Sequence, residues 1–130
     1  MTDLVQWLRT QLDEDERIAR AADPGPWKSE SLGRHDQAAI KLAASTSLIQ
    51  FDGSRAAANG MHAARHDPAR VLREVEAKRR IVDAHERRPM PKGDTADCAQ
   101  CWGAVWPCPT LRLLASVYDG RPGYQESWHP

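Results

Sequence analysis

The sequence predicts an α+β fold. Two long helices pack together and on a small antiparallel sheet of two or three strands, and a zinc-knuckle-like segment with a short helix follows at the C-terminal end. Three observations lead to this prediction. Apolar residues recur at helical spacing over residues 3–22 and again from residue 67 to about residue 87. Short apolar or β-branched runs bounded by turn residues lie between residues 27 and 51. All three cysteines fall within residues 98–108.

Length and composition place the chain among single globular domains. It has 130 residues, 41% of them hydrophobic, which is typical of one folded domain. We therefore predict one domain over residues 1–130, with a helix–sheet–helix core over 1–88 and a cysteine-containing subregion over 89–130. Eighteen basic side chains balance eighteen acidic ones, so the net charge is zero. This balance argues against a disordered tail protein and gives no support to a general nucleic-acid binder.

The N-terminal half predicts the first long helix and the sheet. Leu4, Trp7, Leu8 and Leu12 fall on one side of the first helix. That helix should end before Pro24, since the residue before a proline disfavours the α conformation. The strands are expected at residues 27–32, 38–43 and 47–51.

The second half begins with an Ala-rich stretch, residues 56–66, that fits a short helix or an extended lead-in. Asp67 and Pro68 then predict the start of the second long helix, because Asp is a good N-cap and Pro is favoured at the first helical position. Residues 88–97 are rich in Pro, Gly and polar side chains and predict a linker loop. Residues 109–118 predict a short final helix.

Charge is distributed unevenly although its sum is zero. Acidic side chains outnumber basic ones in residues 1–24, and the reverse holds in residues 65–88. We interpret this as two helices of complementary charge that pack on each other in the fold or in a homodimer. The competing interpretation is that the basic helix, residues 68–88, binds nucleic acid. It is less favoured because acidic residues are interleaved along that helix.

The cysteines predict a metal site. Cys98 and Cys101 form a C-x-x-C pair, and Cys108 follows six residues later, just before the final helix. Three sulfur ligands require a fourth group for tetrahedral Zn²⁺. His85, near the end of the second long helix, is the first candidate for that group, His129 the second and Asp97 the third.

A structural zinc ion is favoured over inert free thiols and over a redox pair. The C-x-x-C pair is expected in a loop, whereas a thioredoxin-like pair opens a helix after a strand. The ion would also cross-link a final helix that is too short to be stable alone. With four protein ligands the site has no open position, so we expect no catalysis from it.

A third possibility is a small metal-dependent hydrolase that uses His62, His66 and Asp67. It requires those side chains to converge in a pocket. The simpler, non-catalytic interpretation is that the two histidines are exposed to solvent and that Asp67 is a helix cap. The sequence shows no secretion signal and no membrane span, so we expect a cytoplasmic protein.

Several motifs give the chain a family resemblance. In order they are AADPGPW, HAARHDPARVLREVEAKRRIVDAH, the C-x-x-C pair and WPCPTLRLLA. The chain resembles a family of small uncharacterised proteins from Streptomyces, related actinobacteria and their phages. This resemblance implies an accessory role in a phage or its host, and it carries over no catalytic residue. We therefore expect a non-enzymatic interaction protein with an unknown protein partner.

Overall fold

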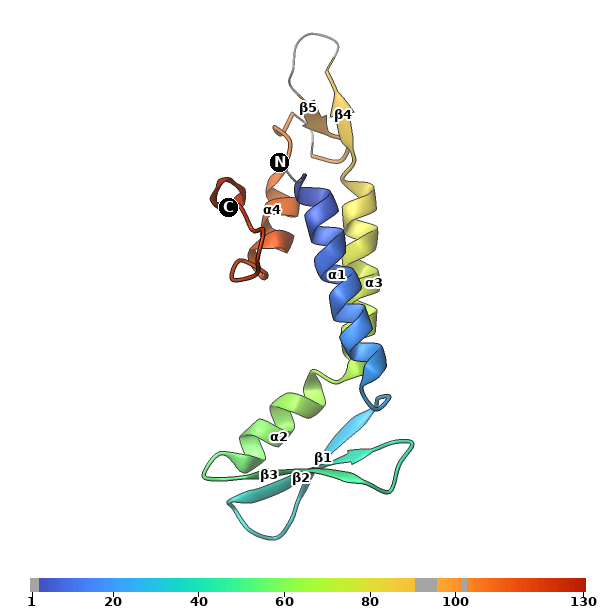
Figure 1. Ribbon diagram of the computed structural model, residues 1–130, viewed down its shortest axis with the longest axis vertical. Helices are drawn as coiled ribbons and strands as arrows, with labels where there is room; N and C mark the ends of the chain where they lie inside the picture. The colour runs from blue at the N-terminus through green and yellow to red at the C-terminus, as the bar shows by residue number, and fades with distance from the viewer. Residues whose placement is uncertain (1–2, 91–95, 102) are drawn as a thin grey trace. The chain divides into compact units, whose positions relative to one another are not determined.

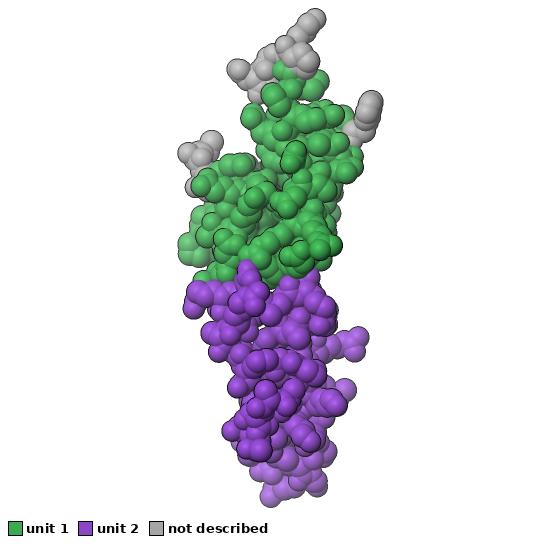
Figure 2. Space-filling view, turned by 90° about the vertical axis from the view of Figure 1, so that its right-hand side faces the viewer, with its two compact units in different colours: residues 1–14, 75–130 green, residues 15–74 purple. Residues whose placement is uncertain are grey.

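The computed structural model describes residues 3–90, 96–101 and 103–130, and these residues confirm the predicted α+β class. The chain forms two compact units, Met1–Glu14 with Val75–Pro130 and Asp15–Glu74 (Figure 2). Helix α1 (Leu4–Ala21) and helix α3 (Pro68–Ala84) each contribute to both units. The prediction of one domain stays a prediction, because two compact units in one chain can still unfold together.

The unit formed by residues 15–74 contains a three-stranded antiparallel sheet in the order β1-β2-β3 (Figure 1). Its strands are β1 (Trp27–Ser31), β2 (Gln37–Leu42) and β3 (Leu48–Asp52). In the register, Ile40 of the central strand lies opposite Ser29 and Ile49. The sheet packs against helix α2 (Ala56–Arg65). For residues 56–66 the sequence allowed either a short helix or an extended lead-in, and the structure shows the helix.

A buried carboxylate fastens the loop before the sheet to the start of α3. Asp67 is 6% exposed, and its Oδ1 accepts the backbone N–H of Arg70 at 2.8 Å. Its Oδ2 accepts the backbone N–H of Trp27 at 3.0 Å. The first bond confirms the predicted cap, whereas the second was not foreseen. Gly25 is required beside it, because a Cβ atom there would lie 2.5 Å from Asp67 Oδ2.

We expect Asp67→Ala to lower the free energy of unfolding by about 2–3 kcal/mol, since it removes a helix cap and leaves a partly buried N–H without an acceptor. Asp67→Asn should recover only part of that loss. Its amide oxygen can cap α3, but its NH₂ group cannot accept from Trp27. Urea denaturation of the three proteins measures both effects, and an alanine variant within 0.5 kcal/mol of wild type would contradict this account.

The other unit is organised by the N-terminal part of α1 and the C-terminal part of α3. Leu4, Leu8 and Leu12 are fully buried along α1, and Val82 is buried on α3. Two ion pairs join the helices, with Arg9 bound to Asp83 at 2.9 Å and Arg79 bound to Asp13 at 2.7 Å. The two helices therefore contact each other within one chain, as predicted, but of these two pairs only Arg79–Asp13 joins a basic residue of α3 to an acidic residue of α1.

The C-terminal segments complete this unit. Strand β4 (Arg87–Pro89) pairs with strand β5 (Ala96–Cys98) in a short antiparallel ladder. The predicted loop over residues 88–97 was therefore wrong at both of its ends, which belong to these strands. Helix α4 (Pro109–Ser116) and the 3₁₀ turn η1 (Glu126–Trp128) follow. The final residues lie over α1 through Tyr124 and Trp128, both of which contact the ring of Trp7.

Tyr124 carries a buried hydroxyl that has no hydrogen-bond partner among the described residues. Burial, with the nearby carboxylates of Asp119 and Glu126, raises the pKa of Tyr124. Because its pKa is higher in the folded state, the protonated Tyr124 is favoured by folding. The free energy of unfolding is therefore unaffected by this group below the ordinary tyrosine pKa of about 10, and it falls as the pH rises from there through the pKa of the folded protein.

We therefore expect Tyr124→Phe to leave stability unchanged or to raise it by about 1 kcal/mol at neutral pH, because it removes an unpaired buried polar group. Above pH 10 the variant should become more stable relative to wild type. The reason is that the free tyrosine of the unfolded wild-type chain ionises there, whereas the buried ring resists ionisation, and phenylalanine does not titrate. Denaturation midpoints at pH 7 and above pH 10 test both statements. A variant that is clearly less stable at pH 7 would show that the hydroxyl has a partner.

Candidate metal centre

The site begins at the end of α3. His85 follows directly after the last helical residue, and its backbone N–H donates to the carbonyls of Ile81 and Val82, both at 3.1 Å. These bonds hold the backbone of His85 at the helix terminus. Strand β4 starts two residues later, so the chain changes direction immediately after the histidine.

The β4–β5 ladder brings the first cysteine to this histidine. Its register places Arg87 opposite Cys98, and the backbone N–H of Ala99 donates to the carbonyl of Glu86 at 2.8 Å. Cys98 is fully buried. The ladder thus explains how a residue thirteen positions along the chain meets His85.

A tight turn then presents the second cysteine. The backbone N–H of Cys101 donates to Cys98 Sγ at 3.4 Å, and that of Ala104 donates to the carbonyl of Cys101 at 2.9 Å. Gly103 has φ +73°, a backbone conformation that glycine adopts without strain. This turn directs both sulfurs of the C-x-x-C pair toward the same point.

The third cysteine stands at the N-terminus of α4. Cys108 directly precedes Pro109, the first residue of the helix, and its carbonyl accepts the N–H of Arg112 at 3.1 Å. Its side chain is fully buried. The positive end of the helix dipole lies at this terminus and favours a thiolate there.

The four side chains surround one point. His85 Nδ1 lies 3.3 Å from Cys98 Sγ, 3.4 Å from Cys101 Sγ and 3.5 Å from Cys108 Sγ. All four ligand atoms lie within 4.8 Å of one another. Tetrahedral zinc with ordinary bond lengths separates a nitrogen ligand from a sulfur ligand by about 3.5 Å. His85 and the three cysteines are therefore close enough to bind one metal ion, and they form no disulfide.

Hydrogen bonding alone does not account for this arrangement. A ring nitrogen carries either one proton or one lone pair, so His85 Nδ1 can form only one good hydrogen bond, yet three sulfurs surround it at similar distances. A cation at the centre would satisfy all four atoms at once. The spacing of the four atoms is compatible with that of ligands around one metal ion.

The electrostatics of the thiols agree with this interpretation. Burial alone would raise the pKa of Cys98, but the backbone N–H groups of Cys101 and Gln100, with His85, bring it to about 7. Burial and the neighbouring sulfurs of Cys98 and Cys101 raise the pKa of Cys108 to about 11. A divalent cation would offset the negative charge of adjacent thiolates.

The structure also separates the three candidates for the fourth ligand. His85 joins the cysteines, whereas His129 is exposed in the C-terminal segment. Both carboxylate oxygens of Asp97 accept from the Arg88 guanidinium, at 3.1 and 2.9 Å. Metal binding by the four gathered residues stays a prediction. Sequence reasoning missed Thr110, whose Oγ1 lies 3.8 Å from Cys101 Sγ.

The residues of the hydrolase hypothesis are arranged differently. The rings of His62 and His66 are 4.5 Å apart and both side chains are exposed. The two oxygens of Asp67 accept backbone N–H groups. These contacts are those expected of an exposed histidine pair and a helix cap.

No helix among the described residues is long and apolar enough to cross a membrane.

Comparison with known proteins gives the family of the chain. No curated protein and no solved structure matches the chain. A family model described as a family of unknown function matches residues 1–130, the entire sequence. The chain therefore belongs to DUF6221, a family of unknown function.

Proposed function

We propose that the chain is a non-enzymatic accessory protein that binds another protein and that a structural Zn²⁺ ion holds its C-terminal region together. The observation that supports the ion is the position of His85 Nδ1, which is nearly equidistant from three cysteine sulfurs. The accessory role in an actinobacterial host or its phage comes from the family resemblance.

The donor set favours zinc over other common ions. Thiolate ligands disfavour the hard cations Mg²⁺ and Ca²⁺, and a compact set of three sulfurs and one nitrogen suits the tetrahedral preference of Zn²⁺. Four protein ligands leave no position for water or substrate, which is the pattern of structural zinc sites.

The position of the site explains what the ion would contribute. It would join the end of α3, strand β5 and the start of α4. Strands β4 and β5 have three residues each and α4 has eight, and elements this short are marginal without further support. The proposed ion would supply that support.

The ion pairs of the basic helix count against nucleic-acid binding. Within α3, Arg70 pairs with Glu74 and Arg80 pairs with Glu76. Arg79 pairs with Asp13 of α1. Guanidinium groups already bound to carboxylates are less available to phosphates, so nucleic-acid binding by residues 68–88 stays the less favoured prediction.

Metal content tests the proposal. Protein purified without chelators should contain about one zinc ion per chain by elemental mass spectrometry, and native mass spectrometry should show the same stoichiometry. Cys98→Ser and His85→Ala should reduce the zinc content strongly. His129→Ala is the matched control, since it removes the rival histidine and should retain the ion.

A spectroscopic measurement adds the geometry. Replacement of zinc by Co²⁺ should give the strong visible absorption of a tetrahedral thiolate site, and the bands should change in His85→Ala. Wild-type protein without stoichiometric metal, or with iron in place of zinc, would overturn the assignment. Loss of zinc in His129→Ala but not in His85→Ala would place the fourth ligand elsewhere.

A further inference from the structure

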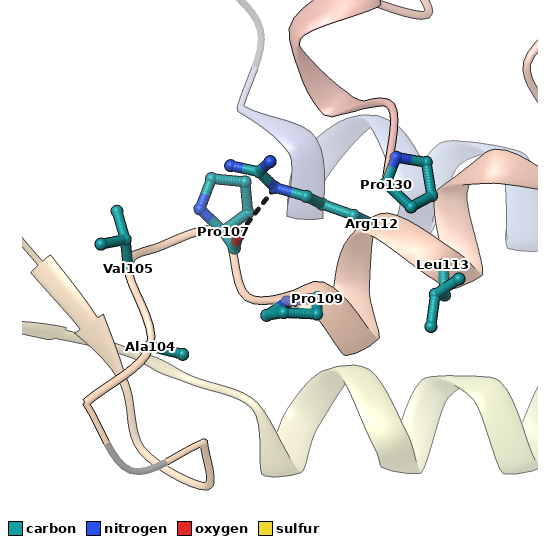
Figure 3. Close-up of a pocket in the computed structure, with 7 residues that line it drawn as sticks. All are labelled: Ala104, Val105, Pro107, Pro109, Arg112, Leu113 and Pro130. Atoms are coloured by element: carbon teal, nitrogen blue, oxygen red, sulfur yellow. Dashed lines mark hydrogen bonds between the residues drawn. The ribbon is translucent and has the colours of Figure 1, made fainter.

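An apolar groove lies next to the metal centre. It has a volume of about 410 Å³ and is formed by the loop after the C-x-x-C turn, the first turns of α4 and the last residue of the chain (Figure 3). This volume falls within the range of about 300–1,000 Å³ that is typical of ligand pockets. All of its lining residues belong to the same compact unit as the metal centre.

The groove exposes large apolar side chains. Val105 is 72% exposed and Leu113 is 58% exposed, and both line it. Pro107, Pro109 and Pro130 supply further walls and have no backbone N–H to donate. Such walls do not support the addition of a β-strand, so recognition here must come from the insertion of apolar side chains.

Among the described residues, Arg112 is the one that brings a charged side chain to the lining. Its Nε donates to the carbonyl of Pro107 at 3.0 Å, which restricts the orientation of the guanidinium (Figure 3). An arginine held in this way presents its remaining N–H groups in a planar fork that matches a carboxylate. The groove therefore combines an apolar floor with one oriented cation.

We propose that this groove binds a short segment of a partner protein in which a bulky apolar side chain lies beside a carboxylate. The apolar side chain would enter between Val105 and Leu113, and the carboxylate would pair with Arg112. This inference rests on the proposed protein-binding function and names the chemistry of the partner.

The metal centre controls the groove in this proposal. Val105 and Pro107 lie on the chain between Cys101 and Cys108, and α4 begins directly after Cys108. An ion bound to both cysteines would fix the two ends of this wall. Removal of the ion should therefore weaken peptide binding as well as stability.

A random heptapeptide library displayed on phage provides the probe. Selection on zinc-loaded wild-type protein should enrich peptides that share an acidic residue next to Leu, Phe or Trp. Synthetic versions labelled for fluorescence anisotropy should bind saturably, and replacement of their acid by its amide should weaken binding at least tenfold.

Three variants locate the binding surface. Leu113→Asp should abolish binding of the selected peptides. Arg112→Glu should lose the acidic peptides and prefer versions in which Lys replaces the acid. Val117→Asp is the matched control, because Val117 is 66% exposed at the end of the same helix but does not line the groove. It should bind like wild type.

Several results would overturn the proposal. The first two are a selection that enriches no peptides and one whose peptides share no acidic residue. The third is an equal loss of peptide binding in Val117→Asp and Leu113→Asp. The fourth is a homodimer that Leu113→Asp dissociates, because the groove would then be occupied by a second copy of the chain. Zinc content measured on the same samples separates the two proposals. A zinc-loaded protein that binds no peptide refutes the groove alone, whereas a metal-free protein refutes the zinc site.

Discussion

Removal of the proposed metal ion is expected to lower the free energy of unfolding by at least about 4 kcal/mol, which corresponds to a free ion at roughly a thousand times its dissociation constant. The reason is that the elements around the site are too short to persist without a cross-link. Helix α4 has eight residues and β4 and β5 have three each. Structural zinc sites supply folding free energy directly, because their ligands gather only in the folded chain.

The loss should be local as well as large. After treatment with a zinc chelator, hydrogen exchange should accelerate first in β5, in the turn at Cys101 and in α4. Cys98 lies in β5 and Cys101 in the turn, Cys108 lies directly before α4, and His85 lies just before β4. Cys98→Ser should reproduce both the urea denaturation midpoint and the exchange pattern of the chelated protein.

The control is again His129→Ala, which should have the stability of wild type and the same sensitivity to chelation. An unchanged denaturation midpoint after chelation would refute the structural role of the ion, provided that elemental analysis shows the ion to be gone. Retained protection in α4 of the metal-free protein would refute the argument from element length.

Much of the fold could be predicted because its signals are local. Asp67 and Pro68 indicate the start of α3, which begins at Pro68. Pro24 indicates that α1 must end before it, and α1 ends at Ala21. The three strands occupy nearly the predicted ranges. Each of these predictions depends on residues within a few positions of the element itself, where capping and backbone restrictions act.

The convergence of the four candidate metal ligands could also be predicted, from the coordination chemistry of zinc rather than from local backbone signals. Three cysteines close in sequence require a fourth donor for a tetrahedral ion, and few candidates stood near. The path that brings them together could not be predicted. The β4–β5 ladder places Cys98 opposite Arg87 through pairing across a loop of polar residues, and three-residue strands carry almost no periodic signal.

The division into two units was hidden for a related reason. The apolar pattern of α1 continues through both units, so the sequence gives no sign that Leu12 and Ala19 lie in different ones. The same holds for α3. Contacts between distant segments decide where a unit ends, and a periodic pattern reports only which side of a helix is buried.

Trp7 of α1 contacts the C-terminal segment through its ring and its Nε1. It is 5% exposed, and its ring lies 5.6 Å from that of Tyr124 and 5.3 Å from that of Trp128. Its Nε1 donates to the carbonyl of Pro122 at 3.0 Å. One side chain of α1 thus joins three residues that are more than a hundred positions away.

We expect Trp7→Ala to lower the free energy of unfolding by about 3–5 kcal/mol, because it removes a large buried ring and leaves a cavity beneath Tyr124 and Trp128. Trp7→Phe should lose only about 1–2 kcal/mol, since it keeps most of the apolar contact and forfeits the hydrogen bond to Pro122. Urea denaturation measures both values. Equal losses in the two variants would mean that the hydrogen bond, and not ring burial, holds the segment. A loss below about 1 kcal/mol in Trp7→Ala would mean that the C-terminal residues are held by other contacts, and in that case hydrogen exchange over residues 118–128 should be unchanged as well.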